Sequence, residues 1–259
     1  MDFLEAIRFL TIIPVPASRA TPAGLARSMP YFPLVGLIIG LILGGLWLAL
    51  RLVFPQIVVG ALLVTCLAIL TGGHHLDGLA DTSDALVAGR TREQRLAIMS
   101  DTRVGAFGIT GLALILLIKY ACITANTTLS AIIIFPLLAR WALCGAILVF
   151  PAAKSSGMGA DAKRNAGWPE FLAATLICLV PTITLAGLVE CLLLMLATFL
   201  LVMALGLLFS RLFGGLTGDN YGALVETGEA LALLTLIALT PLFTHLPGNG
   251  LLKLPTPMG

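Results

Sequence analysis

The sequence predicts an all-α polytopic membrane protein with about seven transmembrane helices and an N-terminal interfacial helix. Of its 259 residues, 59% are hydrophobic and only 11% are charged, and the mean hydropathy is +1.05. Soluble domains carry about 25% charged residues, so a chain this apolar is expected to lie mostly in lipid. Its net charge of +2 is too small to indicate nucleic acid as a partner. The lipid bilayer is therefore the first partner that the composition predicts.

The N-terminal stretch alternates charged and bulky apolar side chains. Within residues 1–13, Asp2, Glu5 and Arg8 are separated by apolar residues. This pattern predicts an amphipathic helix that is too charged to span a membrane and that lies at its interface. Acidic residues stand where a signal peptide carries basic ones, so we expect no cleaved signal. A proline-containing loop completes an N-terminal segment over residues 1–33.

Seven apolar runs are candidates for spans, because a helix needs about 20 mostly apolar residues to cross a bilayer. They cover about 34–54, 56–72, 104–124, 129–150, 170–188, 190–213 and 230–247. The long connections are polar and form loops at 73–103, 151–169 and 214–229. Since no soluble insertion separates them, residues 1–259 are predicted to form a single integral membrane domain.

Three glycines in the first run, Gly36, Gly40 and Gly44, stand four residues apart. Small residues at this spacing allow two membrane helices to approach closely. Glycine also occurs in apolar runs without such a role, and the sequence leaves the two interpretations open.

Charge is distributed unevenly between the two sides of the predicted bundle. If the N-terminus is cytoplasmic, all three polar loops fall on the cytoplasmic side, with eleven of the fifteen lysines and arginines. An excess of positive charge marks the cytoplasmic side of membrane proteins. Every acidic residue except Glu190 falls on the same side. A face so rich in charge predicts a catalytic or binding surface built at the membrane.

The loop at 73–103 begins with an unusual group of carboxylates. Asp77, Asp81 and Asp84 recur at i, i+4 and i+7, so on a helix they share one face. Their repulsion is relieved by a cation, and oxygen ligands without thiolates favour Mg²⁺. We therefore predict a Mg²⁺ site for a phosphate or pyrophosphate substrate. The alternative is an acidic helix start, where aspartates cap the helix and interact with its dipole.

A second acidic helix start is predicted in the loop at 214–229. Asp219 and Glu226 share a helix face at i and i+7, and they are candidates for further ligands of one or two Mg²⁺ ions or for a general base. The glycine-rich approach, which includes Gly218, offers backbone N–H groups at a helix N-terminus, where phosphate binds well.

Other polar residues are candidates for substrate binding. Asp101 and Arg103 stand directly before the third run and Gly105 stands at its start, where arginine can clamp phosphate and glycine allows close backbone approach. Lys154 and Lys163 lie in a basic, glycine-rich loop that can hold an anion, although basic loops are also common without such a role.

Two cations within the apolar runs need separate interpretations. Arg140 is near the middle of the fourth run, where an unpaired charge is costly. It is predicted to face the bundle interior and to pair with an acid or with substrate. Lys119 is closer to the end of its run and is expected to extend to the interface. Arg90, Arg92 and Arg95 either signal topology or clamp phosphate.

At these residues the chain resembles the cobalamin-5′-phosphate synthase, or adenosylcobinamide-GDP ribazoletransferase, family. Three motifs carry the resemblance: Gly-Gly-x-His75-x-Asp77-Gly-Leu-Ala-Asp81-x-x-Asp84, Asp101-x-Arg103-x-Gly-x-x-Gly and Gly-Gly-Leu-Thr-Gly-Asp219-x-x-Gly-Ala-x-x-Glu226. One departure is Ala85, where the family commonly has glycine. No side-chain chemistry is lost by this change.

The resemblance implies a Mg²⁺-dependent transferase in the bacterial cytoplasmic (inner) membrane, with its active face in the cytoplasm. Its small-molecule substrates would be adenosylcobinamide-GDP and α-ribazole or its 5′-phosphate, and its products adenosylcobalamin or its phosphate and GMP. Arg103 would help to hold charge. His75 or one of Asp81, Asp219 and Glu226 would accept the hydroxyl proton. A homo-oligomer is left open.

Two other classes compete with this interpretation. CDP-alcohol phosphotransferases have Asp-Gly-x-x-Ala-Arg, whereas Asp77-Gly-Leu-Ala-Asp81 lacks the arginine and the Gly/Asp spacing that follows it. A transporter would be expected to line a path with acids inside its spans, whereas the acids here gather in loops on one predicted face.

Overall fold

The computed structural model describes residues 2–16, 27–125, 128–164 and 166–243. Its elements are α1 (Asp2–Leu10), the short 3₁₀ helix η1 (Met29–Tyr31), α3 (Phe32–Leu50), α4 (Gln56–Leu70), α5 (His74–Ala88), α6 (Arg92–Ile98), α7 (Ala106–Thr124), α8 (Leu129–Val149), α9 (Met158–Arg164), α10 (Trp168–Ala186), α11 (Leu188–Phe213) and α12 (Gly218–Phe243). Helices dominate the described part of the chain, and the only strand-like pairing there is an isolated bridge between Ala152 and Leu216. The predicted all-α class is confirmed.

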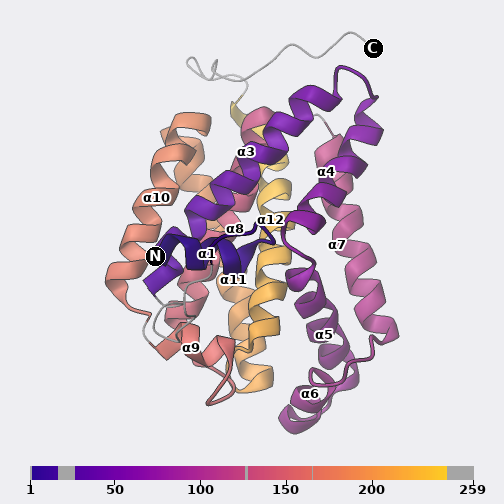
Figure 1. Ribbon diagram of the computed structural model, residues 1–259, viewed down its shortest axis with the longest axis vertical. Coiled ribbons are helices and arrows are strands. Elements are labelled where there is room, and N and C mark those ends of the chain that lie inside the picture. The colour runs from indigo at the N-terminus through magenta and orange to yellow at the C-terminus, as the bar shows by residue number, and fades with distance from the viewer. Residues whose placement is uncertain (1, 17–26, 126–127, 165, 244–259) are drawn as a thin grey trace.

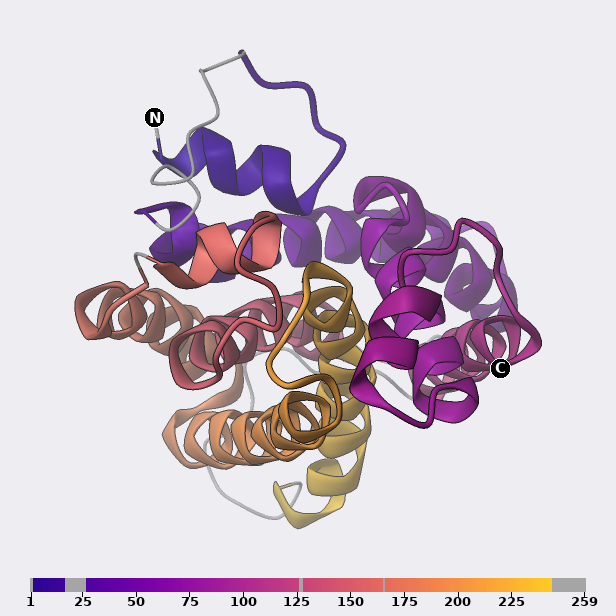
Figure 2. The same cartoon turned by 90° about the horizontal axis from the view of Figure 1, so that it is seen from below.

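The centre of the bundle is α8, which packs against α3, α10, α11 and α12. Figures 1 and 2 show these four helices grouped around it. Every residue of α8 from Ala131 to Ile147 is buried. This explains why α8 is apolar on all sides except at Arg140, because a helix buried all round has no face to present to water.

The glycines of α3 serve close packing against α8. A Cβ at Gly36 would lie 2.5 Å from the carbonyl oxygen of Pro136, and one at Gly40 would overlap the backbone of Ile133. A Cβ at Gly44 would lie 3.0 Å from the Leu129 side chain. The structure thus decides between the two open interpretations in favour of helix–helix contact.

Among the residues that the structure describes, six helices are long and apolar enough to cross a membrane, and the bent pair α4–α5 makes a seventh if it is counted as one span. The two helices of the pair meet at 92°. Gly72 and Gly73 form the break, with φ of 64° and 70°, a conformation that residues with a Cβ rarely adopt. The predicted span at 56–72 therefore corresponds to the first helix of this bent pair.

Two of the predicted polar loops are largely helical. The loop at 73–103 contains α5 and α6, and the predicted loop at 214–229 is mostly the first half of α12. The seventh span was predicted to begin near residue 230, which is wrong by about three turns. The error arose because Glu226 and Glu229 were assigned to water, whereas both are buried in the bundle.

The N-terminal helix α1 forms as predicted and buries Ala6 and Leu10. It packs against α3, and the Ile12 N–H after it donates to the Leu70 carbonyl at 2.9 Å, at the end of α4. A Cβ at Gly72 would overlap the Ile12 side chain. The segment after α1 is therefore fastened to the α4–α5 break. The position of α1 at the membrane interface stays a prediction.

Candidate active site

The predicted acidic helices α5 and α12 cross at two glycines. A Cβ at Gly78 would lie 2.6 Å from the backbone oxygen of Asp219, and one at Gly222 would lie 3.1 Å from the Cα and the carbonyl oxygen of His75. Contact this close between two backbones requires glycine on each helix at the crossing. It places Asp219 directly beside the aspartates of α5.

Three of the predicted carboxylates form what we call the acidic face: Asp77, Asp81 and Asp219. Asp77 is exposed, whereas Asp81 and Asp219 are half-buried. The carboxylate of Asp81 is repelled by those of Asp77, Asp219 and Asp84. No lysine, arginine or histidine of the described residues forms an ion pair with any member of the acidic face. The face thus gathers negative charge that no neighbouring side chain pairs directly.

Asp84 has a different environment from the other two aspartates of α5. Its Oδ2 accepts the Gly105 N–H at 2.7 Å and its Oδ1 accepts the Gly108 N–H at 2.8 Å. Gly105 is the N-cap of α7, so this carboxylate satisfies two of the N–H groups that a helix start leaves free. A Cβ at either glycine would lie 2.5 Å from an Asp84 oxygen. The Gly-x-x-Gly spacing is explained by this contact, and Asp84 holds α5 against α7.

A chain of hydrogen bonds that the sequence reasoning missed links α5 to the start of α12. The Asn220 N–H donates to Thr217 Oγ1 and the Thr217 N–H donates to Asn220 Oδ1, both at 3.1 Å. The Asn220 Nδ2 then donates to Thr82 Oγ1 at 3.1 Å. The signal was present in the sequence, since Thr-x-x-Asn directly before a helix has the spacing of a capping box.

The basic loop reaches the acidic face through Lys154. The Ala153 N–H donates to the Leu216 carbonyl at 2.9 Å, and the Leu216 N–H donates to the Pro151 carbonyl at 2.8 Å. This pairing holds the segment before Lys154 beside the approach to α12, and the exposed Lys154 attracts the carboxylate of Asp219. Space is open beside Gly218 at the start of α12. Lys154 and Gly218 therefore lie near Asp219, and their predicted contact with substrate stays a prediction.

Lys163 is placed elsewhere. Its Nζ donates to the Leu148 carbonyl, close to the C-terminal end of α8. Cations are favoured at that end of a helix because its carbonyls carry negative partial charge. Burial lowers the pKa of Lys163 from its ordinary value. The structure thus gives Lys163 a helix-capping contact, and its predicted contact with substrate stays a prediction.

Asp101 and Arg103 form a two-pronged ion pair before α7. Arg103 Nε donates to Asp101 Oδ1 at 3.0 Å and Nη2 donates to Oδ2 at 2.7 Å, while the Arg103 backbone N–H also donates to Oδ1 at 3.0 Å. These hydrogen bonds from Arg103 hold the pKa of Asp101 at about 2. The Arg103 side chain is 86% exposed. It is oriented by Asp101 and remains open to an anionic ligand.

Two of the arginines interpreted as topology signals or phosphate clamps have structural partners. Arg92 donates to the carbonyls of Phe213 at 2.9 Å and Ala153 at 3.0 Å, and Arg95 donates to the carbonyl of Leu212 at 3.4 Å. Both therefore cap the C-terminal end of α11 and fasten α6 to it. Neither guanidinium is directed to the acidic face by these bonds.

The remaining predicted site residues lie in the bundle interior. Lys119 Nζ pairs with Glu226 Oε2 at 2.5 Å and also with Glu229, and Arg140 pairs with Glu229. Lys119 is 1% exposed, so the expectation that it extends to the interface was wrong. Arg140 was predicted to pair either with an acid or with substrate. It is fully buried and pairs with an acid. Glu229 had not been predicted as a site residue.

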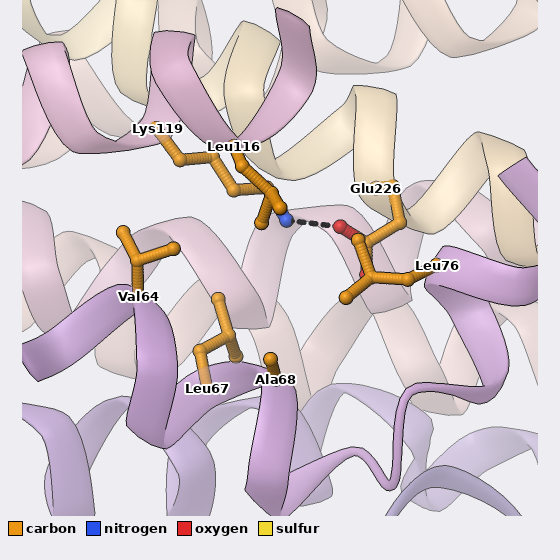
Figure 3. A pocket seen from close by; sticks show the side chains of 7 residues that line it. All are labelled: Val64, Leu67, Ala68, Leu76, Leu116, Lys119 and Glu226. Atoms are coloured by element: carbon orange, nitrogen blue, oxygen red, sulfur yellow. Dashed lines mark hydrogen bonds and ion pairs between the residues drawn. The ribbon is translucent and has the colours of Figure 1, made fainter. Parts of the chain in front are cut away.

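A small hollow lies beside this group (Figure 3). It is lined by Val64, Leu67, Ala68, Leu76, Leu116, Lys119 and Glu226. The hollow is too narrow to hold a water molecule, and most of the residues that line it are apolar. Figure 3 shows Lys119 and Glu226 pointing toward one another at one side of it. Glu226 is therefore surrounded by the Lys119 ammonium group and by apolar side chains.

His75 also faces the interior. It is buried against Gly222 of α12 and lies in electrostatic range of Arg140, Glu229 and Lys119. On a helix of 3.6 residues per turn its side chain points away from those of Asp77 and Asp81. The structure does not bring His75 to the acidic face.

The acidic face consists of carboxylates, which are ligands of the kind that Mg²⁺ prefers. Within the described residues, no three Asp, Glu, His or Cys side chains converge closely enough to enclose a metal ion by themselves. Mg²⁺ commonly binds through one or two carboxylates and completes its shell with water and substrate phosphates. Asp77, Asp81 and Asp219 offer unpaired carboxylates for this mode of binding, whereas Asp84 and Glu226 already have partners.

Comparison with known proteins agrees with these motifs. A family model described as cobalamin-5-phosphate synthase matches residues 2–237. A Geotalea daltonii protein named adenosylcobinamide-GDP ribazoletransferase is 40% identical over 92% of this chain and 97% of its own. Proteins of that name from Desulfitobacterium hafniense and Roseiflexus sp. are 40% and 36% identical, over 88% and 92% of this chain and 93% and 90% of theirs. No solved structure matches at a significant level. The chain belongs to the cobalamin-5-phosphate synthase family.

Proposed function

We propose that this chain is an adenosylcobinamide-GDP ribazoletransferase of the bacterial inner membrane. It joins adenosylcobinamide-GDP to α-ribazole or α-ribazole 5′-phosphate and releases GMP. The observation that carries the proposal is the family match over residues 2–237, which includes every member of the acidic face. The reaction is attack by an alcohol on a pyrophosphate: a new phosphate ester bond forms, the bond to the GMP oxygen breaks, and the alcohol loses its proton.

Mg²⁺ is the cofactor of this proposal, and one or two of the carboxylates of Asp77, Asp81 and Asp219 would hold it, with water and substrate phosphate as its other ligands. When bound, it would neutralise negative charge on the pyrophosphate and on the departing phosphate. Two features support this assignment. The carboxylate of Asp81 is repelled by the other two, and among the described residues none of the three forms an ion pair with a lysine, arginine or histidine. The glycine crossing of α5 and α12 brings the two helices that carry them into contact.

The protein itself positions the anionic substrate and accepts the proton. Arg103, oriented by Asp101, and Lys154, which attracts the carboxylate of Asp219, would supply positive charge to the phosphates. The open N-terminus at Gly218 adds backbone N–H groups for a phosphate oxygen. Asp81 or Asp219 then accepts the hydroxyl proton, because His75 points into the bundle.

The site lies at the end of the bundle that carries α5, α6, α9 and the start of α12 (Figure 1). Arg92, Arg103, Lys154 and Lys163 are at or near this end. The excess of basic residues favours the cytoplasmic side for it. Both substrates would thus reach the acidic face from the cytoplasm, while the outer surfaces of α10 and α11 contact lipid.

GMP release by detergent-purified protein tests the proposal. The assay supplies adenosylcobinamide-GDP and α-ribazole phosphate, with Mg²⁺ or with EDTA, and compares wild type with Asp81→Asn. We expect Mg²⁺-dependent release coupled to a cobalamin product, and loss of it in the variant. Folded wild type that releases no GMP under these conditions would overturn the assignment. Release of CMP from a CDP-alcohol would place the chain in the rival enzyme class.

A further inference from the structure

We infer that Lys119, Arg140, Glu226 and Glu229 form a charge-neutral ion network that positions Asp219 for the reaction. In this arrangement Glu226 is a positioning residue and neither binds the metal nor accepts the proton. The inference rests on the proposed function, since it assigns how one member of the acidic face is held in place.

The network joins three helices inside the bundle. Lys119 of α7 pairs with both glutamates of α12, and Arg140 of α8 pairs with Glu229. All four side chains are at most 3% exposed. Two cations and two carboxylates sum to no net charge. A neutral set is the arrangement that a low-dielectric interior tolerates, because removing one partner leaves an uncompensated buried charge.

The network and the acidic face lie on one stripe of α12. Asp219, Gly222, Glu226 and Glu229 follow at i, i+3, i+7 and i+10 of a single helix. At about 1.5 Å per residue, Glu226 lies about 10 Å along the helix axis from Asp219. A helix is stiff over this distance, so fixing the rotation and height of α12 at Glu226 and Glu229 also fixes them at Asp219.

The α5 crossing makes that register critical. Gly78 and Gly222 allow backbone contact only when each glycine faces its present partner. A shift of α12 by one residue would turn it by about 100° and bring a side chain into this contact. The network lies near α5 as well, because Arg140, Glu229 and Lys119 all act electrostatically on His75. Together, the ion network and the glycine crossing fix the rotation and the height of α12 in the bundle.

A double-variant cycle tests the inference. Lys119→Met and Glu226→Gln each unbalance the network by one charge. The double variant Lys119→Met/Glu226→Gln removes one charge of each sign and leaves the Arg140–Glu229 pair. We expect each single variant to lose activity about 100-fold and the double variant to return to within about 10-fold of wild type, because coupled partners are not additive. The Mg²⁺ concentration that gives the half-maximal rate should be unchanged in the double variant.

The alternative role of Glu226 predicts a different result. A metal ligand or general base cannot be restored by changing Lys119, so a double variant as inactive as Glu226→Gln, or one that needs far more Mg²⁺, would overturn the inference. Lys119→Met/Asp81→Asn is the matched control and should show no recovery. Recovery there would also count against the inference, since it would show that losing Lys119 compensates for any lost carboxylate.

The thermal stability of the four proteins in detergent gives a second reading that needs no activity. If a single variant fails to fold, recovery of a folded double variant supports the network, and a double variant that also fails contradicts it. The two proposals can fail separately. Wild type that releases no GMP rejects the proposed function, whereas active wild type without recovery in the double variant rejects only the network.

Discussion

Gly78 of α5 lies against the backbone of Asp219 in α12, so closely that a Cβ at Gly78 would be 2.6 Å from the Asp219 carbonyl oxygen. This contact joins two acidic segments that are more than a hundred residues apart in the sequence. The distance between the carboxylates of the acidic face therefore depends on how closely α5 and α12 pack. A substitution at the crossing should change that distance even if it adds no charge and removes no carboxylate.

Gly78→Val should therefore inactivate the enzyme without touching a carboxylate. The branched side chain would push α12 away and separate Asp219 from Asp81, and we expect a rate about 100-fold lower, the scale of loss that small displacements cause at active sites. GMP release at saturating Mg²⁺ measures it. Gly45→Val is the control, because nothing lies within 4 Å of a Cβ there. Equal rates for the two variants would contradict the role of the crossing.

Asp84 should behave as a helix cap and Asp81 as a ligand. Because Asp84 accepts two N–H groups at the start of α7, we expect Asp84→Ala to cost about 1–2 kcal/mol of stability, as lost caps do. Thermal inactivation in detergent measures this loss. Asp81→Asn should instead raise the Mg²⁺ needed for half-maximal rate and leave stability nearly unchanged. The reverse pattern would make Asp84 the ligand.

The sequence predicted the spans well because the signal for them is local. Five of the six long helices lie within a few residues of their predicted apolar runs, and the carboxylate spacing on α5 follows from helix periodicity alone. The boundary of α12 was missed for the opposite reason. Glu226 and Glu229 look like loop residues until their partners Lys119 and Arg140 are known, and these partners are 89 to 110 residues away.

The same limit applies to individual roles. The three aspartates of α5 are equivalent in the sequence, and only the position of α7 shows that Asp84 bonds to Gly105 and Gly108 whereas Asp81 does not. Likewise, Lys154 and Lys163 share one basic loop, but backbone pairing carries the first to Asp219 while the second caps α8. Residue type and spacing predict a charged face, and tertiary packing decides which members meet there.

The Asp101–Arg103 pair should not contribute to the pH dependence of the reaction near neutrality. The pKa of Asp101 is about 2, below its ordinary value, so its stabilising contribution is complete above about pH 4 and is lost as the pH falls through 2. Asp101→Asn should raise KM about 10-fold, because Arg103 loses its orientation. The factor should be the same at pH 6 and at pH 8. A pH–rate profile that changes shape between these values would contradict this assignment.

Cysteine labelling in whole cells tests the orientation of the bundle. Glu93 on α6 and Leu52 in the α3–α4 connection are both exposed, at opposite ends of the bundle. We expect Leu52→Cys to react with a membrane-impermeant reagent from outside and Glu93→Cys to react only after the membrane is opened. The half-buried Cys66 is replaced by serine in both variants, whereas the other four cysteines are buried. Labelling of Glu93→Cys from outside would invert the topology and place the acidic face away from the cytoplasm.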